Sequence, residues 1–134
     1  MKYITVQNIQ VPTIGLGTWR LYGKECSHIV TEALEMGYRH IDTAQMYENE
    51  FDVGDGVKNA SVDRDDVFIT TKLSSLNMNM GQGLESFENS LRKLQTDYVD
   101  LLLMHSPPEQ PLDIIEQMLS LKQQGKVKAI GMSN

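Results

Sequence analysis

The sequence is poor in cysteine, proline and aromatic residues, and it has no excess of positive charge. Its 134 residues include one cysteine, Cys26, four prolines and 7% aromatic residues. A single cysteine excludes an internal disulfide and is typical of a reducing compartment, so we expect a cytoplasmic protein. Because 18 acidic residues outnumber 12 basic ones, the formal net charge is -6. Nucleic acid and anionic membrane surfaces are therefore not expected as partners.

Long hydrophobic runs are also missing. No stretch approaches the roughly 18 apolar residues that a membrane-spanning helix needs, and residues 1–5 lack the apolar segment of a signal peptide. No set of His, Cys and Asp has the spacing of a metal site, so we expect no metal. What is present is 40% hydrophobic and 22% charged residues. That composition is typical of a soluble globular chain, and the length suggests one domain at most.

Strand and helix patterns alternate along the chain. Two short β-prone runs at residues 3–6 and 9–11 predict a β-hairpin, and Pro12 is expected to end its pairing. Further strands are predicted at 14–16, 38–41, 67–71, 98–104 and 127–131. Helices are predicted at 24–36, 48–59, 83–94 and 112–123. This order predicts an α/β fold with right-handed crossovers and a parallel sheet.

Two architectures share this order of elements. One is an open, doubly wound sheet of five strands, which suits the length of the chain. The other is the first half of an eight-stranded barrel, a fold that usually needs about 250 residues. Periodicity does not separate the two, and length alone favours the open sheet.

Polar or aromatic side chains follow every predicted parallel strand. In strand order they are Thr18 and Trp19, Asp42 and Tyr47, Lys72, His105, and Ser133 and Asn134. Each of them alone has an ordinary explanation, such as a turn cap or a solvated charge. In parallel α/β folds, however, the ligand site lies at the carboxyl ends of the strands. An Asp, a Tyr, a Lys and a His after three successive strands therefore indicate one site.

Proton transfer to a carbonyl is the chemistry that unites these four side chains. A tyrosine phenol, with an ordinary pKa of about 10, can donate a proton but is a reluctant acid. The ammonium of Lys72 would stabilise the tyrosinate left on Tyr47, and Asp42 would hold that ammonium in place. His105 would orient the carbonyl oxygen. The hydride must come from a cofactor, because no side chain supplies one.

Five segments resemble motifs of the aldo-keto reductase superfamily. Residues 37–50 (GYRHIDTAQMYENE) resemble its signature, and residues 15–19 (GLGTW) resemble its first-strand motif. FITTKL, DYVDLLLMH and GMSN, which begin at Phe68, Asp97 and Gly131, are similar to its third, fourth and fifth strands. Within the superfamily, the bacterial 2,5-diketo-gluconate reductase-like enzymes are the most similar group. The resemblance covers the whole chain and favours the barrel over the open sheet.

The resemblance implies that residues 1–134 form a single partial domain, the N-terminal half of a (β/α)8 barrel. That half comprises the hairpin, five parallel strands and four helices. The implied activity is NADPH-dependent reduction of aldehydes or ketones to alcohols, with Tyr47 as the general acid. The other implied catalytic residues are Asp42, Lys72 and His105. The implied cofactor contacts are Ser133 and Asn134 with the nicotinamide carboxamide, and Thr18 and Asp42 with its ribose.

The implied substrate pocket is lined by Trp19, Tyr47 and His105. Many members of the family have tryptophan where this chain has Ser74 and Ser106. Both differences remove aromatic walls from the implied pocket, so they bear on the choice of carbonyl substrate and leave the proton donor unchanged.

Two other functions remain open at this point. One is a non-catalytic half-barrel that associates with itself or another chain through its open sheet edges, which unpaired strands favour. The other is an open-sheet phosphate or flavin module, which would need a phosphate loop that residues 18–21 lack.

The resemblance also bears on the activity of these 134 residues alone. In the family, residues after the seventh and eighth strands bind the cofactor phosphates. We therefore expect weak or absent activity from these 134 residues alone.

Overall fold

The N-terminus forms the predicted hairpin in a computed structural model that describes residues 1–134. Strand β1 (Tyr3–Val6) pairs antiparallel with β2 (Ile9–Pro12). Gln7 and Asn8, which join them, both have positive φ angles of 48° and 64°. Two such residues in a two-residue loop make the type of turn whose twist matches a hairpin.

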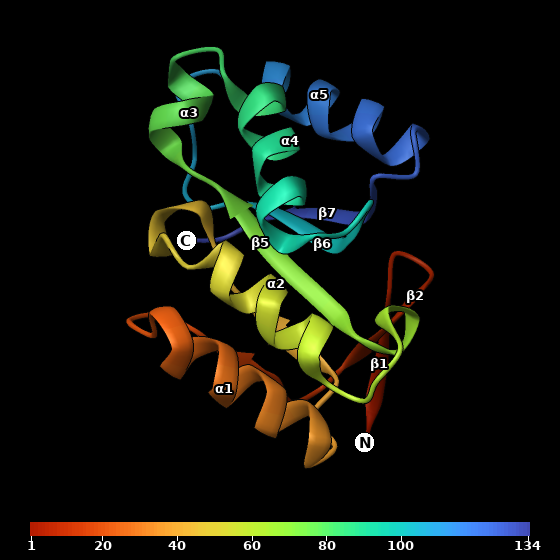
Figure 1. Cartoon of the computed structure of the whole chain (residues 1–134). Helices are drawn as coiled ribbons and strands as arrows, with labels where there is room; N and C mark the ends of the chain where they lie inside the picture. Colours follow the sequence, from red (N-terminus) through yellow and green to blue (C-terminus); the bar gives the residue numbers. More distant parts are fainter.

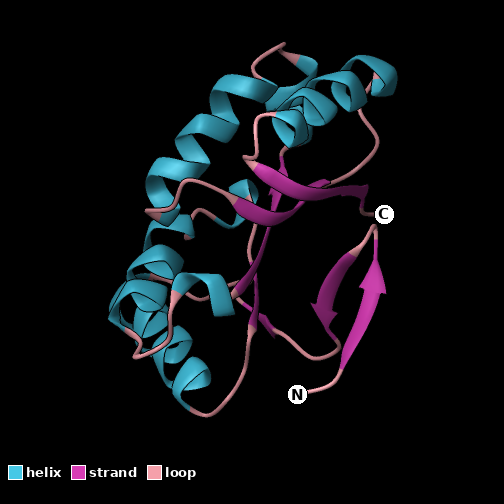
Figure 2. Cartoon of the chain, turned by 90° about the vertical axis from the view of Figure 1, so that its right-hand side faces the viewer, coloured by secondary structure: helices cyan, strands magenta, loops and turns pink.

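The remaining strands form one parallel sheet of five, in the order β3-β4-β5-β6-β7. They are β3 (Leu16–Gly17), β4 (His40–Asp42), β5 (Phe68–Leu73), β6 (Val99–Met104) and β7 (Val127–Met132). A doubly wound sheet would reverse its strand order at a switch point. Here each strand lies beside the next one in the chain, and Figure 2 shows the helices on one face of the curved sheet with the hairpin on the other. This is the arrangement of part of a barrel.

The four predicted helices are confirmed. They are α1 (Gly23–Glu35), α2 (Glu50–Asn59), α4 (Gly83–Leu94) and α5 (Pro111–Gln123). The structure adds the 3-10 turns η1 (Gln45–Tyr47) and η2 (Arg64–Asp66) and a fifth α-helix, α3 (Ser75–Asn79). Five residues are too few to show a periodic pattern, so α3 could not be predicted. Its N-cap is Ser74, whose hydroxyl accepts a hydrogen bond from the Asn77 amide.

The main core lies between the sheet and the helices and contains 20 buried apolar residues. Within this layer α2 lies between α1 and α4, as Figure 1 shows. Two glycines of α2 permit this close approach. A Cβ on Gly54 would lie 2.7 Å from the backbone of Leu94 in α4, and one on Gly56 would lie 2.6 Å from the Ser27 carbonyl of α1. Helix α2 is thus held tightly against both neighbours.

The edge strand β7 has a second contact, with the hairpin. The Gln7 side chain donates to the Ile130 carbonyl at 2.7 Å and accepts from the Ile130 amide at 3.3 Å. No helix of the structure is long and apolar enough to cross a membrane.

Candidate active site

The alternation of side chains along β5 separates two environments. All six residues of β5 are buried. Thr71 contacts Glu50 at the start of α2, whereas the next residue, Lys72, contacts Asp42 at the end of β4. Because successive strand residues point to opposite faces, Lys72 is directed away from the helices and toward the rim of the sheet.

Lys72 and Asp42 form a short ion pair at this rim. The Lys72 ammonium donates to both carboxylate oxygens of Asp42, at 2.8 and 2.7 Å, and to the Thr43 carbonyl at 3.0 Å. The Lys72 side chain is only 7% exposed and that of Asp42 is 33% exposed. A bidentate, charge-assisted contact of this kind fixes the position of the ammonium and compensates for its burial.

Tyr47 and His105 complete the cluster. The Lys72 ammonium lies 3.2 Å from the Tyr47 hydroxyl, and the Tyr47 and His105 rings meet edge to face with centroids 5.8 Å apart. The His105 amide donates to the Leu73 carbonyl at 3.0 Å, which extends the pairing of β5 and β6 to the rim. The structure thus brings together all four residues predicted to carry out proton transfer.

The surroundings of His105 favour the neutral form of its imidazole. Burial, and then the Lys72 cation beside it, lower the pKa of His105 below its ordinary value of 6.5. Its Nδ1 atom is buried without a hydrogen-bond partner. A neutral imidazole has one N–H donor and one acceptor nitrogen. His105 is therefore suited to hydrogen bonding with an uncharged oxygen.

Ser133 and Asn134 lie at the same rim, directly beyond β7. The Ser133 amide donates to the Met104 carbonyl at 2.9 Å, and the Asn134 side-chain amide donates to the His105 carbonyl at 2.8 Å. Both residues are thereby tied to the end of β6, beside His105.

Comparison with known proteins identifies the family of this chain. A model of the aldo/keto reductase family matches residues 13–134. The chain belongs to the aldo/keto reductase family. It is 45% identical over 127 residues to methylglyoxal reductase DkgA of Yersinia pestis, an alignment that covers 92% of this chain and 45% of that protein.

Solved aldo/keto reductase structures match the fold closely. A crystal structure of an aldo/keto reductase from Brucella melitensis is 40% identical with a TM-score of 0.92, covering 99% of this chain and 54% of that one. A putative 2,5-diketo-D-gluconic acid reductase B is 42% identical with a TM-score of 0.87, covering 96% and 46%. The chain thus spans about half the length of its relatives, and the predicted family, subgroup and half-barrel fold are confirmed.

Thr18 lies directly behind Asp42 in this aldo/keto reductase chain. It is completely buried, and its hydroxyl donates to the Asp42 carbonyl at 2.9 Å. Thr18 thus supports Asp42, and its contact with the cofactor ribose stays a prediction. Trp19, in contrast, is 62% exposed, and the Arg20 guanidinium lies over its ring.

Asn49 is a buried residue of the site that the sequence did not single out. It is 0% exposed, donates to the carbonyls of Thr18 and Leu21 at 2.7 and 2.9 Å, and accepts from the Thr43 hydroxyl at 2.7 Å. Asn49 therefore ties the loop after β3 to the loop after β4. Asp42 is the last residue of β4. A polar residue just before a helix suggests an N-cap, yet the Asn49 side chain makes no cap bond to α2.

Ser74 and Ser106 border the site as expected from their places after β5 and β6. Ser74 caps α3, and the hydroxyl of its neighbour Ser75 contacts the hydroxyl of Ser106. The two loops are joined by hydroxyl groups at this point. Nowhere in the structure do three or more His, Cys, Asp or Glu residues lie close enough together to hold a metal ion.

Proposed function

We propose that this chain carries the proton-donating part of an NADPH-dependent reductase that converts aldehydes or ketones to alcohols, with Tyr47 as the general acid. The observation that supports it most is the Lys72 ammonium, which contacts the Asp42 carboxylate at 2.7 Å and the Tyr47 hydroxyl at 3.2 Å. A buried cation at this place can stabilise the tyrosinate that forms when the Tyr47 phenol gives up its proton.

In the proposed reaction, the Tyr47 hydroxyl gives its proton to the carbonyl oxygen of the substrate. NADPH, when bound, supplies the hydride that goes to the carbonyl carbon. The Lys72 cation stabilises the negative charge that develops on the Tyr47 oxygen, and Asp42 keeps the ammonium from turning away. Because Lys72 is only 7% exposed, its charge is weakly screened by water and acts strongly at this short distance.

His105 orients the substrate in this proposal. Its neutral imidazole can donate a hydrogen bond to the carbonyl oxygen without placing a second positive charge next to Lys72. The exposed ring of Trp19 would form one wall of the substrate pocket. The methylglyoxal reductases among the relatives make a small carbonyl compound a suitable first substrate to test.

The residues at the rim fit the nicotinamide end of NADPH. Asn134 donates through its amide nitrogen to the His105 carbonyl, while its Oδ1 atom receives no hydrogen bond. That oxygen and the Ser133 hydroxyl can pair with a carboxamide. The Asp42 carboxylate is 33% exposed, so a ribose hydroxyl can reach it.

The test of this function is aldehyde-dependent oxidation of NADPH, followed with methylglyoxal, in a complete barrel that contains these 134 residues and in its Tyr47→Phe variant, because the residues after the seventh and eighth strands are expected to be needed for cofactor binding. We expect the substitution to lower the rate by about 100-fold or more, because general acid catalysis contributes that much. Tyr22→Phe is the matched control, since Tyr22 is 55% exposed and its hydroxyl makes no hydrogen bond. Activity retained in Tyr47→Phe would refute the assigned role.

A second candidate function is association through the sheet edges. In the five-stranded sheet β3 and β7 each have only one neighbouring strand, and unpaired strand edges favour pairing with another chain. This alternative is favoured if the unsubstituted chain sediments as a concentration-dependent oligomer and shows no sign of the cofactor. The latter means that it does not oxidise NADPH and that a fluorescence titration detects no NADPH binding. A monomer at all concentrations counts against it.

A further inference from the structure

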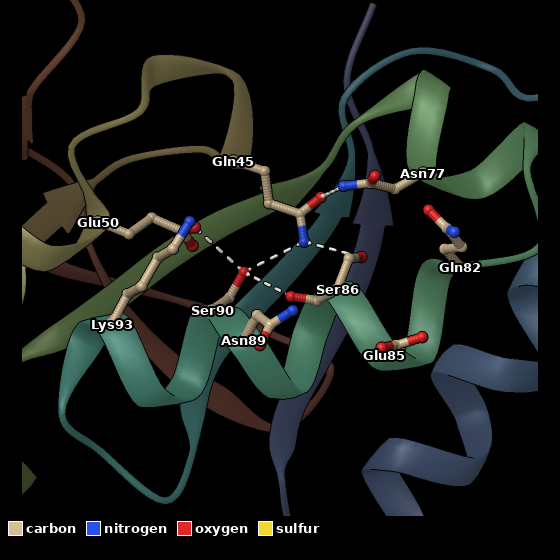
Figure 3. A pocket seen from close by; sticks show the side chains of 9 residues that line it. All are labelled: Gln45, Glu50, Asn77, Gln82, Glu85, Ser86, Asn89, Ser90 and Lys93. Carbon is tan, nitrogen blue, oxygen red and sulfur yellow. Dashed lines mark hydrogen bonds between the residues drawn. The ribbon is translucent and has the colours of Figure 1, made fainter.

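A polar cavity of about 240 Å³ lies on the helical side of the sheet, between η1, α3 and α4 (Figure 3). All nine residues that line it are polar or charged. In Figure 3 the carboxamide of Gln45 lies among Ser86, Ser90 and Asn77, and dashed lines join it to each of them. Gln45 is also the first residue of η1, the turn that ends with Tyr47.

The η1 turn is weakly held by its own backbone. Only two backbone hydrogen bonds close it, from Tyr47 to Ala44 at 3.1 Å and from Glu48 to Gln45 at 3.2 Å. Glu48, which ends the turn, has a left-handed φ of 55°, a conformation that costs energy for a residue other than glycine. A single 3-10 turn of this kind needs outside contacts to keep one conformation.

Gln45 supplies these contacts through all of its hydrogen-bonding capacity. Its Nε2 atom donates to the Ser86 and Ser90 hydroxyls at 3.0 and 3.1 Å. Its Oε1 atom accepts from the Ser74 amide at 2.8 Å and from the Asn77 side chain at 3.0 Å. One side chain therefore fastens η1 both to α4 and to the start of α3.

These contacts also fix η1 relative to Lys72. Ser74 lies two residues after Lys72, so the hydrogen bond from the Ser74 amide to Gln45 is the first connection between η1 and the end of β5. The second runs through Ser90, whose hydroxyl contacts Gln45 and the Glu50 carboxylate. Glu50 is 3% exposed and accepts at 2.7 Å from Thr71, the residue before Lys72.

We infer that Gln45 is a positioning residue for the proton donor: its carboxamide holds the η1 turn in register with β5, so that the Tyr47 hydroxyl stays within reach of the Lys72 ammonium. This inference rests on the proposed role of Tyr47. Gln45 touches neither Lys72 nor the Tyr47 hydroxyl, so it acts through the turn alone.

The test replaces Gln45 by methionine, which has a similar length and cannot make these hydrogen bonds. The matched control is Gln82→Met, because Gln82 lines the same cavity and its side chain makes no hydrogen bond. Two readouts follow the turn directly in the intact chain. One is amide hydrogen exchange at Tyr47 and Glu48, and the other is the NMR shift of the Tyr47 ring protons, which the edge-to-face His105 ring perturbs.

In Gln45→Met we expect exchange at Tyr47 and Glu48 to accelerate by about tenfold or more, as in a local opening. Exchange at the Thr71 amide in β5 should stay unchanged, and the Tyr47 ring shifts should move toward those of an unstructured tyrosine. Gln82→Met should match the unsubstituted chain. Unchanged exchange and ring shifts in a folded Gln45→Met variant would overturn the inference.

NADPH oxidation, measured in a complete barrel that contains these 134 residues, is the third readout. We expect Gln45→Met to lower kcat while the KM for NADPH stays the same, because the turn carries the proton donor and no predicted cofactor residue. The proposed role of Tyr47 and the inferred role of Gln45 can fail separately. If Tyr47→Phe keeps its activity, the proposed function is wrong, whereas exchange and ring shifts still decide whether Gln45 holds the turn.

Discussion

Replacing Asn49 by leucine should cost more stability than most single substitutions. The side chain is 0% exposed and makes three hydrogen bonds, with the carbonyls of Thr18 and Leu21 and with the Thr43 hydroxyl. Leucine has the same branching of side-chain heavy atoms and can make none of these bonds, and its larger methyl groups add a packing cost. The Thr18 carbonyl keeps the Leu21 amide as a donor, whereas the Leu21 carbonyl and the Thr43 hydroxyl lose their partner. At about 1–3 kcal/mol for each group left unpaired, the loss should be about 2–6 kcal/mol. Domains are stable by only about 5–15 kcal/mol.

Urea unfolding followed by circular dichroism measures this loss. The midpoint should fall while the slope of the unfolding free energy against urea stays constant, which indicates a stability change alone. Asn59→Leu is the matched control, because Asn59 is exposed at the other end of α2 and its side chain makes no hydrogen bond. A loss below about 1 kcal/mol in Asn49→Leu would show that the orphaned groups find other partners, and would refute the reasoning.

Two further substitutions test charged groups away from the proton donor. Asp100 is 4% exposed and accepts from the Ile69 amide at 2.9 Å and from Arg64 at 3.1 Å, with Lys128 at 3.0 Å. Asp100→Asn should cost about 1–3 kcal/mol in urea unfolding, since both cations are partly solvated, and the loss should shrink in high salt. For Glu50, burial raises the pKa above its ordinary value of 4.5, against the opposing effects of Thr71, Ser90 and Lys93. The contribution of Glu50 to stability is thus present below that value and lost as pH rises through the folded pKa. The stability of Glu50→Gln relative to the unsubstituted chain should therefore rise over that range, and a difference independent of pH would contradict this.

The catalytic cluster could be predicted from sequence because its geometry follows from the fold. Asp42, Lys72 and His105 each lie at the carboxyl end of a predicted strand, and parallel strands bring those ends to one rim. Tyr47 needed more, since it lies in the η1 turn beyond the strand. Its place five residues after Asp42 made it a candidate, and the motif over residues 37–50 supported the assignment. The choice between open sheet and barrel also came from motifs, because length alone favoured the wrong architecture.

The residues that support the cluster could not be predicted, because their partners are distant in the chain. Gln45 bonds Ser90, which lies 45 residues away, and Asn49 bonds the Thr18 carbonyl 31 residues before it. Both lie inside the motif that suggested the family, where they counted only as spacing between Asp42 and α2. Local patterns predict which face of an element is buried. They do not show which hydroxyl or carbonyl will meet a buried amide.

The start of α2 combines two kinds of support that experiments can separate. Asn49 and Glu50 are adjacent, yet Asn49 holds the loops after β3 and β4, whereas Glu50 contacts Thr71 of β5 and Ser90 of α4. Since Asn49 is completely buried and joins the loops after β3 and β4, its loss should lower global stability. Gln45 holds one turn beside a polar cavity, so its loss should open that turn alone. If Gln45→Met lowered the urea midpoint as much as Asn49→Leu, the turn and the core would form one cooperative unit, which would contradict the inference that Gln45 acts through the turn alone.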